Sequence, residues 1–147
     1  MSTDARIVPI ERRHDPYMAR VIREVMTESG AEGPGFSRDD PEVDHLTDAY
    51  AAEGAEFWVI ELDGEVVGGG GFGPLTGSDA FTCELRKMYL LPRARGRGLG
   101  ARLLDRILSA ARAAGYRRCY LESTDSMTAA ARLYQSRGFR RLDPPLV

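Results

Sequence analysis

Arg95-Gly96-Arg97-Gly98-Leu99-Gly100 is the stretch that decides the fold of this chain of 147 residues. It lies between a predicted strand, 80–91, and an amphipathic helix that begins at Leu99 and that Gly115 ends. Glycines allow positive φ angles and close approach of a ligand, while a helix N-terminus carries partial positive charge. The arginines in and beside the loop add more positive charge, namely Arg93, Arg95, Arg97 and Arg102. The sequence therefore predicts an anion site, and a pyrophosphate is its natural occupant.

Common nucleotide motifs do not account for this loop. A Walker A loop requires Gly-Lys followed by Ser or Thr, which the loop does not have. A dinucleotide fingerprint built on Gly98 and Gly100 requires a third glycine where the chain has Leu103. A literal G-x-G-x-x-G match does occur within 68–73, but no helix pattern follows it. We interpret that match as a strand end with a glycine bulge.

Strand and helix patterns alternate on both sides of the loop. Alternating apolar and β-branched runs predict strands at 7–10, 56–62, 65–68, 80–91, 116–122 and 139–142. Apolar residues at helical spacing predict helices at 15–29, 41–53, 99–114 and 127–137. Asp63-Gly64 predicts a hairpin turn, whereas the glycine-rich residues 69–79 are expected to be irregular. This order indicates antiparallel pairing early in the chain and a right-handed β-α-β crossover later.

Composition is that of an ordinary globular protein, with 43% apolar and 29% charged residues. We expect one domain, 1–147, located in the cytoplasm, because no apolar run approaches the ~18 residues of a membrane span and no signal peptide is recognisable. Residues 1–82 carry 17 acidic and 6 basic side chains, whereas residues 83–147 carry 5 and 14. Such asymmetry often indicates a charged partner. Lys87 is the only lysine, and all other basic residues counted here are arginines, which suit phosphate recognition.

Two longer motifs resemble a known family. Glu84-Leu85-Arg86-Lys87-Met88-Tyr89-Leu90-Leu91-Pro92, leading to Arg95-x-x-Gly98-x-Gly100, resembles the acetyl-CoA-binding motif of the GNAT superfamily of N-acetyltransferases. Ala130-x-x-Leu133-Tyr134-x-x-x-Gly138-Phe139 is similar to that family's second signature. The resemblance implies a mixed α/β fold with a mostly antiparallel sheet, a central splayed parallel strand pair and about four flanking helices. The splayed pair would be formed by residues 83–91 and 116–122.

The same resemblance implies acetyl-CoA as cosubstrate, bound where the two parallel strands separate. Backbone groups of Met88 and Leu90 would bind the pantetheine and acetyl carbonyl, and residues 96–101 would bind the pyrophosphate. The implied cofactor-binding residues are Met88, Tyr89, Leu90, Arg95, Gly96, Arg97, Gly98, Leu99, Gly100 and Ala101. Met127 stands where many relatives have an asparagine that binds the pantetheine arm, so this contact is not expected here.

Three side chains are candidates for acid–base catalysis. An amine must lose its proton before it attacks, and Glu84 and Glu122, at the ends of the two cleft strands, match bases in some family members. Tyr134 matches the usual general acid, because a phenol is protonated at neutral pH. Each has a structural alternative: the glutamates could pair with nearby arginines, and Tyr134 could simply fill the core. We favour Glu84 over Glu122.

The acceptor is the least visible part of the reaction. We expect a primary amine on a small molecule, peptide or protein, which attacks acetyl-CoA directly in a ternary complex. Acidic residues between 30 and 50 could attract a cationic amine, or could be a solvated loop and helix start. His14 and His45 are predicted at the surface without metal, and Cys83 as a buried thiol.

Two other classes of function compete with the enzyme. The first is a non-catalytic acyl-CoA sensor on the same fold, which an intact Tyr134 disfavours. The second is a nucleic-acid-binding module, which a pI near 5.7 and the lack of aromatics among the arginines disfavour. No membrane partner is expected. Homodimers are frequent in the family, so a homodimer is possible.

Overall fold

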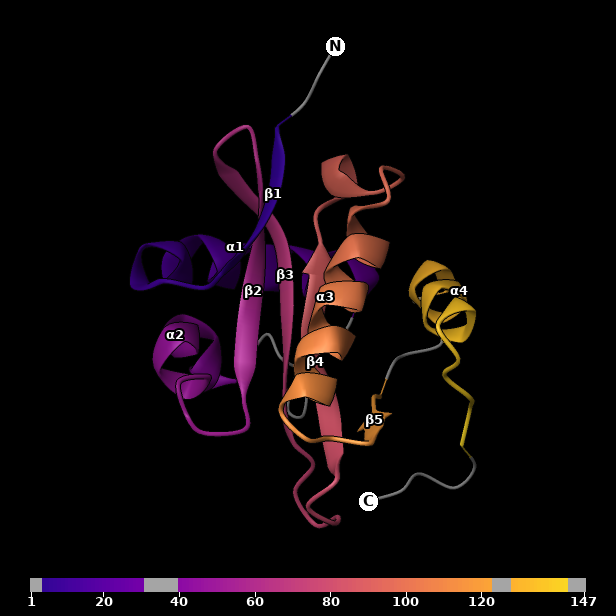
Figure 1. Ribbon diagram of the computed structural model, residues 1–147. Helices are drawn as coiled ribbons and strands as arrows, with labels where there is room; N and C mark the ends of the chain where they lie inside the picture. Colours follow the sequence, from indigo (N-terminus) through magenta and orange to yellow (C-terminus); the bar gives the residue numbers. More distant parts are fainter. Residues whose placement is uncertain (1–3, 31–39, 123–127, 143–147) are drawn as a thin grey trace.

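The computed structural model describes residues 4–30, 40–122 and 128–142. Its sheet contains β1 (Ala5–Pro9), β2 (Glu56–Leu62), β3 (Glu65–Pro74), β4 (Thr82–Leu90) and β5 (Arg118–Tyr120), in that spatial order (Figure 1). The first three pairings are antiparallel, and β4 and β5 are parallel. This sheet confirms the predicted mixed α/β fold with mostly antiparallel pairing.

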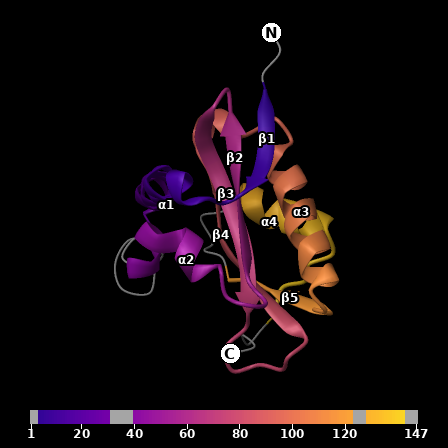
Figure 2. The same ribbon diagram turned by 60° about the vertical axis from the view of Figure 1, so that its left-hand side comes forward.

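Helices cover both faces of the sheet. The α-helices are α1 (Asp15–Ser29), α2 (Leu46–Ala49), α3 (Leu99–Ala113) and α4 (Thr128–Ser136), and short 3-10 helices cover Arg12–His14, Pro41–His45 and Pro92–Ala94. Figure 2 shows α1 and α2 on one face and α3 and α4 on the other. No helix among the described residues is long and apolar enough to cross a membrane.

The two faces have separate cores because side chains alternate along each strand. In β2, Phe57 and Val59 pack with α1, while Trp58, Ile60 and Leu62 pack with α3. Since β2 is buried on both faces, its residues from Phe57 to Ile60 are all apolar instead of alternating. This double burial holds the sheet between two helical layers.

The glycine-rich stretch is not irregular, contrary to the prediction, because β3 continues through it to Pro74. Its glycines are sites of close packing. A Cβ at Gly69 would lie 2.6 Å from the Trp58 carbonyl oxygen and 2.7 Å from the Met18 sulfur. Glycine is therefore needed here to let β2 and α1 pack closely against the strand.

Three other predicted elements differ from the structure. The predicted strand 116–122 is reduced to β5, which pairs only with the first three residues of β4. Residues 139–142 are not a strand. The predicted helix 41–53 is a 3-10 turn followed by α2, because His45 leaves helical geometry with φ −135° and ψ 44°.

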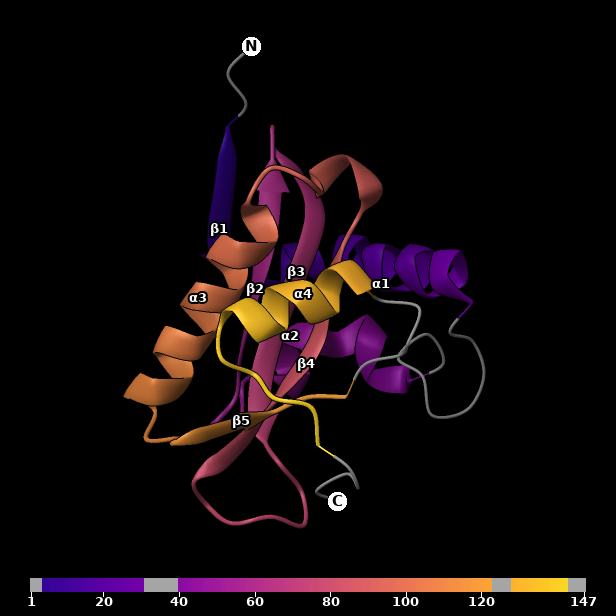
Figure 3. The same cartoon turned by 90° about the vertical axis from the view of Figure 1, so that its right-hand side faces the viewer.

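The parallel strands separate soon after they pair. Thr82, Cys83 and Glu84 of β4 lie opposite Arg118, Cys119 and Tyr120 of β5, where β5 ends. β4 continues to Leu90, and no described strand pairs with this further edge. Figure 3 shows β5 at the lower end of β4, with α4 crossing in front of the upper part. The predicted splayed pair is thus present, but it lies at the edge of the described sheet and not at its centre, because β5 is the last strand in the order.

Candidate active site

The loop between β4 and α3 has the backbone geometry of an anion cradle. Gly96 and Gly98 have φ angles of +73° and +76°, which favour glycine, and Gly98 is the N-cap of α3. An added Cβ at either glycine would meet no atom within 4 Å, so the space above them is open. The backbone N–H of Arg102 donates to Gly98, and the three N–H groups before it have no place in the helical hydrogen-bond series. This cradle fits a pyrophosphate.

Packing of α3 fixes the direction of these N–H groups. Leu99, Leu103, Leu104, Ile107 and Ala111 of α3 are buried against the sheet. A Cβ on Gly100 would be in van der Waals contact with Leu133 of α4, at 3.4 Å. Gly100 thus lies where α3 approaches α4, while Gly96 and Gly98 shape the cradle.

The edge of β4 that leads to the cradle is not paired with any described strand, although the Leu90 carbonyl on it accepts from Arg95. The Leu91 N–H donates to the Val67 carbonyl of β3 at 2.8 Å. Because N–H and C=O groups alternate sides along a strand, those of Leu90 and Met88 point to the opposite edge, where β5 no longer pairs. An extended ligand arm could therefore bind this edge as an added strand would. The sequence prediction placed the pantetheine at these two residues.

A bulge at Lys87 sets this register. Between Gly69 and Gly71 of β3, β4 has one extra residue, and Lys87 has a φ of +51°. Its ammonium, on a side chain only 9% exposed, lies 2.9 Å from Glu42 and 3.2 Å from Asp40. Sequence reasoning gave Lys87 no role. The one feature of the sequence that could have indicated a special role is that Lys87 is the only lysine among many arginines.

The arginines around the loop are partly engaged within the protein. Arg93 pairs with Glu65 at 2.7 Å, and Arg95 pairs with Glu28 of α1, also at 2.7 Å. Arg97 donates from Nε to the Arg93 carbonyl at 3.0 Å. The positive charge predicted here is present, but the guanidinium groups of Arg93 and Arg95 are already paired with carboxylates of the protein.

Tyr134 lies on α4, half-buried against the core of the α3 face. Burial, together with smaller effects of the neighbouring Tyr89 and Cys119, raises the pKa of Tyr134 to about 12. Its ring packs against Phe139 with centroids 5.8 Å apart. Tyr89 belongs to β4 and Cys119 to β5, so Tyr134 lies near the point where these strands separate. The hydroxyl is fully protonated at neutral pH and can donate a proton.

The two candidate bases lie where the parallel strands stop pairing. Glu84 accepts a hydrogen bond from Nε of Arg86 at 2.8 Å, and Glu122 accepts one from the Tyr120 hydroxyl at 3.0 Å. Glu84 and Tyr120 are register partners, so both carboxylates lie at the same end of the splayed pair. The pairing of Glu84 with an arginine is the structural alternative that the sequence left open.

The acidic residues of 40–48 are also paired. Asp40 and Glu42 bind Lys87, Asp44 binds both terminal nitrogens of Arg23, and Asp48 binds Arg12. Their carboxylates therefore stabilise the fold, which favours the structural interpretation over attraction of a cationic amine. Residues 31–39, which include some of the acidic residues considered above, and Met127 lie outside the described residues.

The prediction for His14 was wrong, because this side chain is buried with 1% exposed. Its Nδ1 accepts from the Glu11 N–H at 2.9 Å, and its Nε2 lies 3.4 Å from the buried Glu61. His14 thus joins the start of α1 to β2. His45 is exposed and Cys83 is buried, as predicted. No cluster of three metal-ligating side chains occurs among the described residues.

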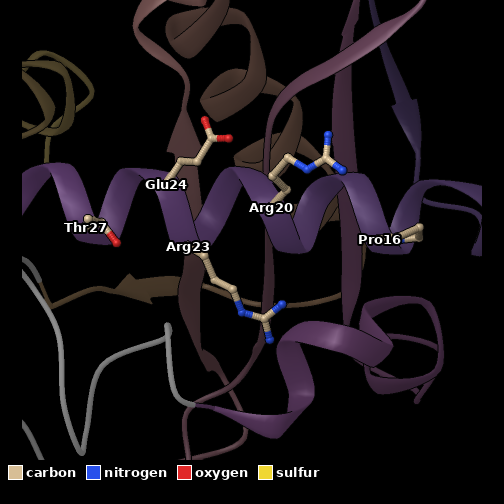
Figure 4. A pocket seen from close by; sticks show the side chains of 5 residues that line it. All are labelled: Pro16, Arg20, Arg23, Glu24 and Thr27. Atoms are coloured by element: carbon tan, nitrogen blue, oxygen red, sulfur yellow. The ribbon is translucent and has the colours of Figure 1, made fainter.

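A shallow depression of about 500 Å³ lies along α1 and is lined by Pro16, Arg20, Arg23, Glu24 and Thr27 (Figure 4). Its lining comes from one helix alone, and Arg23 is held by Asp44. None of the predicted site residues lines it. The depression is therefore distinct from the cradle.

Fold and loop together define an acyl-CoA-dependent acetyltransferase, and residues 22–139 match the model of the acetyltransferase (GNAT) family. The chain belongs to this family and is an N-acetyltransferase. It is 45% identical over 140 residues to YjgM of Escherichia coli (strain K12), called an uncharacterized N-acetyltransferase, a match that covers 92% of this chain and 84% of that protein.

Two solved structures show the same fold. A GNAT-family acetyltransferase from Staphylococcus aureus Mu50 has a TM-score of 0.84 at 22% identity, over 96% of this chain and 87% of that one. The yncA protein of Salmonella typhimurium, solved with its cofactor acetyl-CoA, has a TM-score of 0.77 at 23% identity, over 92% of this chain and 79% of that one.

Proposed function

We propose that this chain, as a single domain over 1–147, transfers the acetyl group of acetyl-CoA to a primary amine of a small molecule, peptide or protein. The observation that carries the proposal is the continuity of the free β4 edge with the glycine cradle at the start of α3. A pantetheine arm bound along the edge would deliver its pyrophosphate to the cradle. The acetyl-CoA in the structurally similar yncA protein supports this choice of cosubstrate.

The residues that would hold acetyl-CoA are backbone groups of Met88 and Leu90 and the loop of residues 96–101. When bound, acetyl-CoA supplies an acetyl group on a thioester whose thiolate is the leaving group. Tyr134 donates its hydroxyl proton to that thiolate, because a pKa of about 12 keeps the phenol protonated at neutral pH. Direct attack by the amine in a ternary complex requires no covalent intermediate on the protein.

A carboxylate must take a proton from the acceptor's ammonium group before the resulting amine can attack. We propose Glu84, with Glu122 as the alternative, because both lie at the end of the splayed pair. Arg86 orients Glu84 through its Nε hydrogen bond of 2.8 Å. The cytoplasmic location and the homodimer stay predictions.

Calorimetric titration with CoA and desulfo-CoA tests the cofactor, and a panel of amines with a thiol-release readout tests the transfer. Gly98→Val should abolish CoA binding without unfolding the protein, because the left-handed backbone at Gly98 is strained for valine while no neighbour crowds a Cβ. Gly30→Val is the matched control, since Gly30 has φ +73° and open space but lies at the end of α1. Failure of the folded wild-type protein to bind any CoA compound would overturn the proposal.

A further inference from the structure

Arg95 is the one arginine of the loop whose guanidinium is almost fully used inside the protein. Its Nε and Nη2 donate to the Leu90 carbonyl at 3.0 and 2.8 Å. Its Nη1 and Nη2 donate to the two carboxylate oxygens of Glu28 at 2.8 and 2.7 Å. A guanidinium has five N–H donors, and four of these are accounted for. Arg95 therefore could not give a phosphate a two-pronged contact without breaking one of these bonds.

The two acceptors of Arg95 lie on two different elements next to the cradle, the end of β4 and the last turn of α1. Leu90 is the last residue of β4, and its carbonyl is on the free edge that leads to the loop. Glu28 is in the last turn of α1, on the other side of the sheet from α3. The planar fork of one side chain thus joins the loop, the end of the strand and a helix 67 residues earlier in sequence.

The loop needs such a constraint. Gly96 directly follows Arg95 and Gly98 begins α3, and both glycines add backbone freedom to an exposed segment. A loop that is already held in its binding conformation loses less conformational entropy when a ligand binds. Four hydrogen bonds from Arg95 supply that constraint from one side of the glycine pair.

Other arginines remain to face an anion. Arg97 uses only Nε, in its bond to the Arg93 carbonyl, and its terminal nitrogens bind none of the described residues. Arg102 is exposed in the first turn of α3. The pairing with Glu28 also raises the pKa of Arg95, and Arg95 lowers the pKa of Glu28, so the ion pair is intact at neutral pH.

We propose that Arg95 is a positioning residue that holds the pyrophosphate loop through Leu90 and Glu28, and that Glu28 of α1 therefore contributes to CoA affinity without touching the ligand. This inference rests on the proposed function. It differs from the sequence prediction, in which Arg95 itself binds the cofactor.

The test is calorimetric titration of CoA into Glu28→Gln and Arg95→Lys. If Arg95 positions the loop, both variants should bind CoA about fivefold more weakly, because Gln lacks the charge and Lys lacks the fork. The double variant should be no weaker than the weaker single one. The KM for acetyl-CoA should rise in parallel while kcat at saturation changes less than twofold.

If Arg95 instead contacts phosphate, the result for Glu28 has the opposite sign. Glu28→Gln would then free the guanidinium and leave CoA binding unchanged or tighter, and Arg95→Lys would keep most of the affinity; either result overturns the proposal. Glu24→Gln is the matched control, exposed one turn earlier on α1, and should bind CoA within twofold of wild type. Glu65→Gln removes the Arg93 pair at the same loop and should behave likewise.

The role of Arg95 and the proposed function are tested by different measurements. Binding of CoA by wild type tests the proposed function, whereas only the difference between Glu28→Gln and the two controls tests the role of Arg95. Thermal unfolding of each variant checks the fold, which should persist because both side chains of the pair are over 40% exposed.

Discussion

Lys87 shows how one side chain can set the geometry of a ligand-binding edge. The left-handed backbone conformation is unfavourable for lysine, yet Lys87 adopts it. Lys87 is the extra residue that shifts the register of β4 against β3. The shift places Met88 and Leu90 on the core of the α3 face, whereas strict alternation from Leu85 would place Lys87 there. Two carboxylates on the opposite face hold the ammonium and thereby favour the bulge.

Replacing Lys87 should therefore cost stability. Lys87→Met leaves Asp40 and Glu42 without their cation, and we expect a loss of about 2 kcal/mol in the free energy of unfolding, since the two carboxylates keep partial access to water. Urea denaturation measures the change. Lys87→Arg is the control and should lose less than half as much, because it keeps the charge. Equal losses in both variants would show that shape, not charge, holds the bulge.

Tyr134 carries the clearest catalytic prediction. Tyr134→Phe should reduce kcat by about 100-fold, the lower range for loss of a general acid, with CoA affinity within twofold of wild type. Because the pKa of Tyr134 is raised to about 12, its ionisation cannot cause a fall in kcat between pH 7 and 10. Steady-state kinetics over that range checks both statements. Tyr17→Phe, on an exposed tyrosine, is the control. An alkaline fall near pH 9 that disappears in Tyr134→Phe would contradict the raised pKa.

Residues with local signatures were predictable from the sequence, and residues defined by distant partners were not. The two left-handed glycines of the loop follow from a motif of six residues. His14 was misplaced because its partner Glu61 is 47 residues away, and nothing near His14 in sequence indicates burial. Glu28 was missed for the same reason, since its partner Arg95 is 67 residues away. Pairing across the sheet is a property of the fold rather than of any short stretch.

At the scale of elements, β3 shows why a glycine run misleads sequence reasoning. Glycine has a low strand propensity, so the run 68–71 predicts an end to the strand. Its glycines instead provide space for Met18, Phe57 and Met88 from three other elements. The α3 helix was predictable because its apolar residues recur at helical spacing within the helix itself. The course of β3, in contrast, depends on side chains from other elements that pack against its glycines.

Two glycines of β3 should respond differently to alanine. A Cβ on Gly71 would collide with the Glu56 carbonyl of β2, which cannot move without breaking the sheet, so Gly71→Ala should lose about 3 kcal/mol. A Cβ on Gly73 would collide only with the flexible end of Arg86, so Gly73→Ala should lose less than half of that. Urea denaturation compares the two. Equal losses of stability would mean that the Arg86 side chain cannot move aside, and that its hydrogen bond to Glu84 holds it in place.

At the scale of the whole molecule, the charge asymmetry of the sequence has an internal explanation. Lys87, Arg93, Arg95 and Arg118 all come from the basic part of the chain and pair with carboxylates from the acidic part. Part of the asymmetry that suggested a charged partner therefore serves to hold the two parts of one chain together. Arg97 and Arg102, near the cradle, do not belong to these pairs.

These pairs should make stability depend on pH. Arginine partners lower the pKa of Glu28, Asp44 and Asp105, and Thr82, the Phe81 N–H and Arg118 lower that of Asp79. A carboxyl whose pKa is lower in the folded state stabilises the fold above its unfolded pKa, and this stabilisation is lost as pH falls through the folded pKa. We therefore expect a Tm that is nearly constant from pH 7 to 5 and falls steadily below about pH 4.

Because these carboxylates are exposed, 0.5 M NaCl should reduce the difference in Tm between pH 7 and pH 3. Asp105→Asn, which removes only the pair with Arg137, should flatten the fall slightly. A Tm that rises on acidification would show that repulsion among the carboxylates outweighs their pairing with arginines.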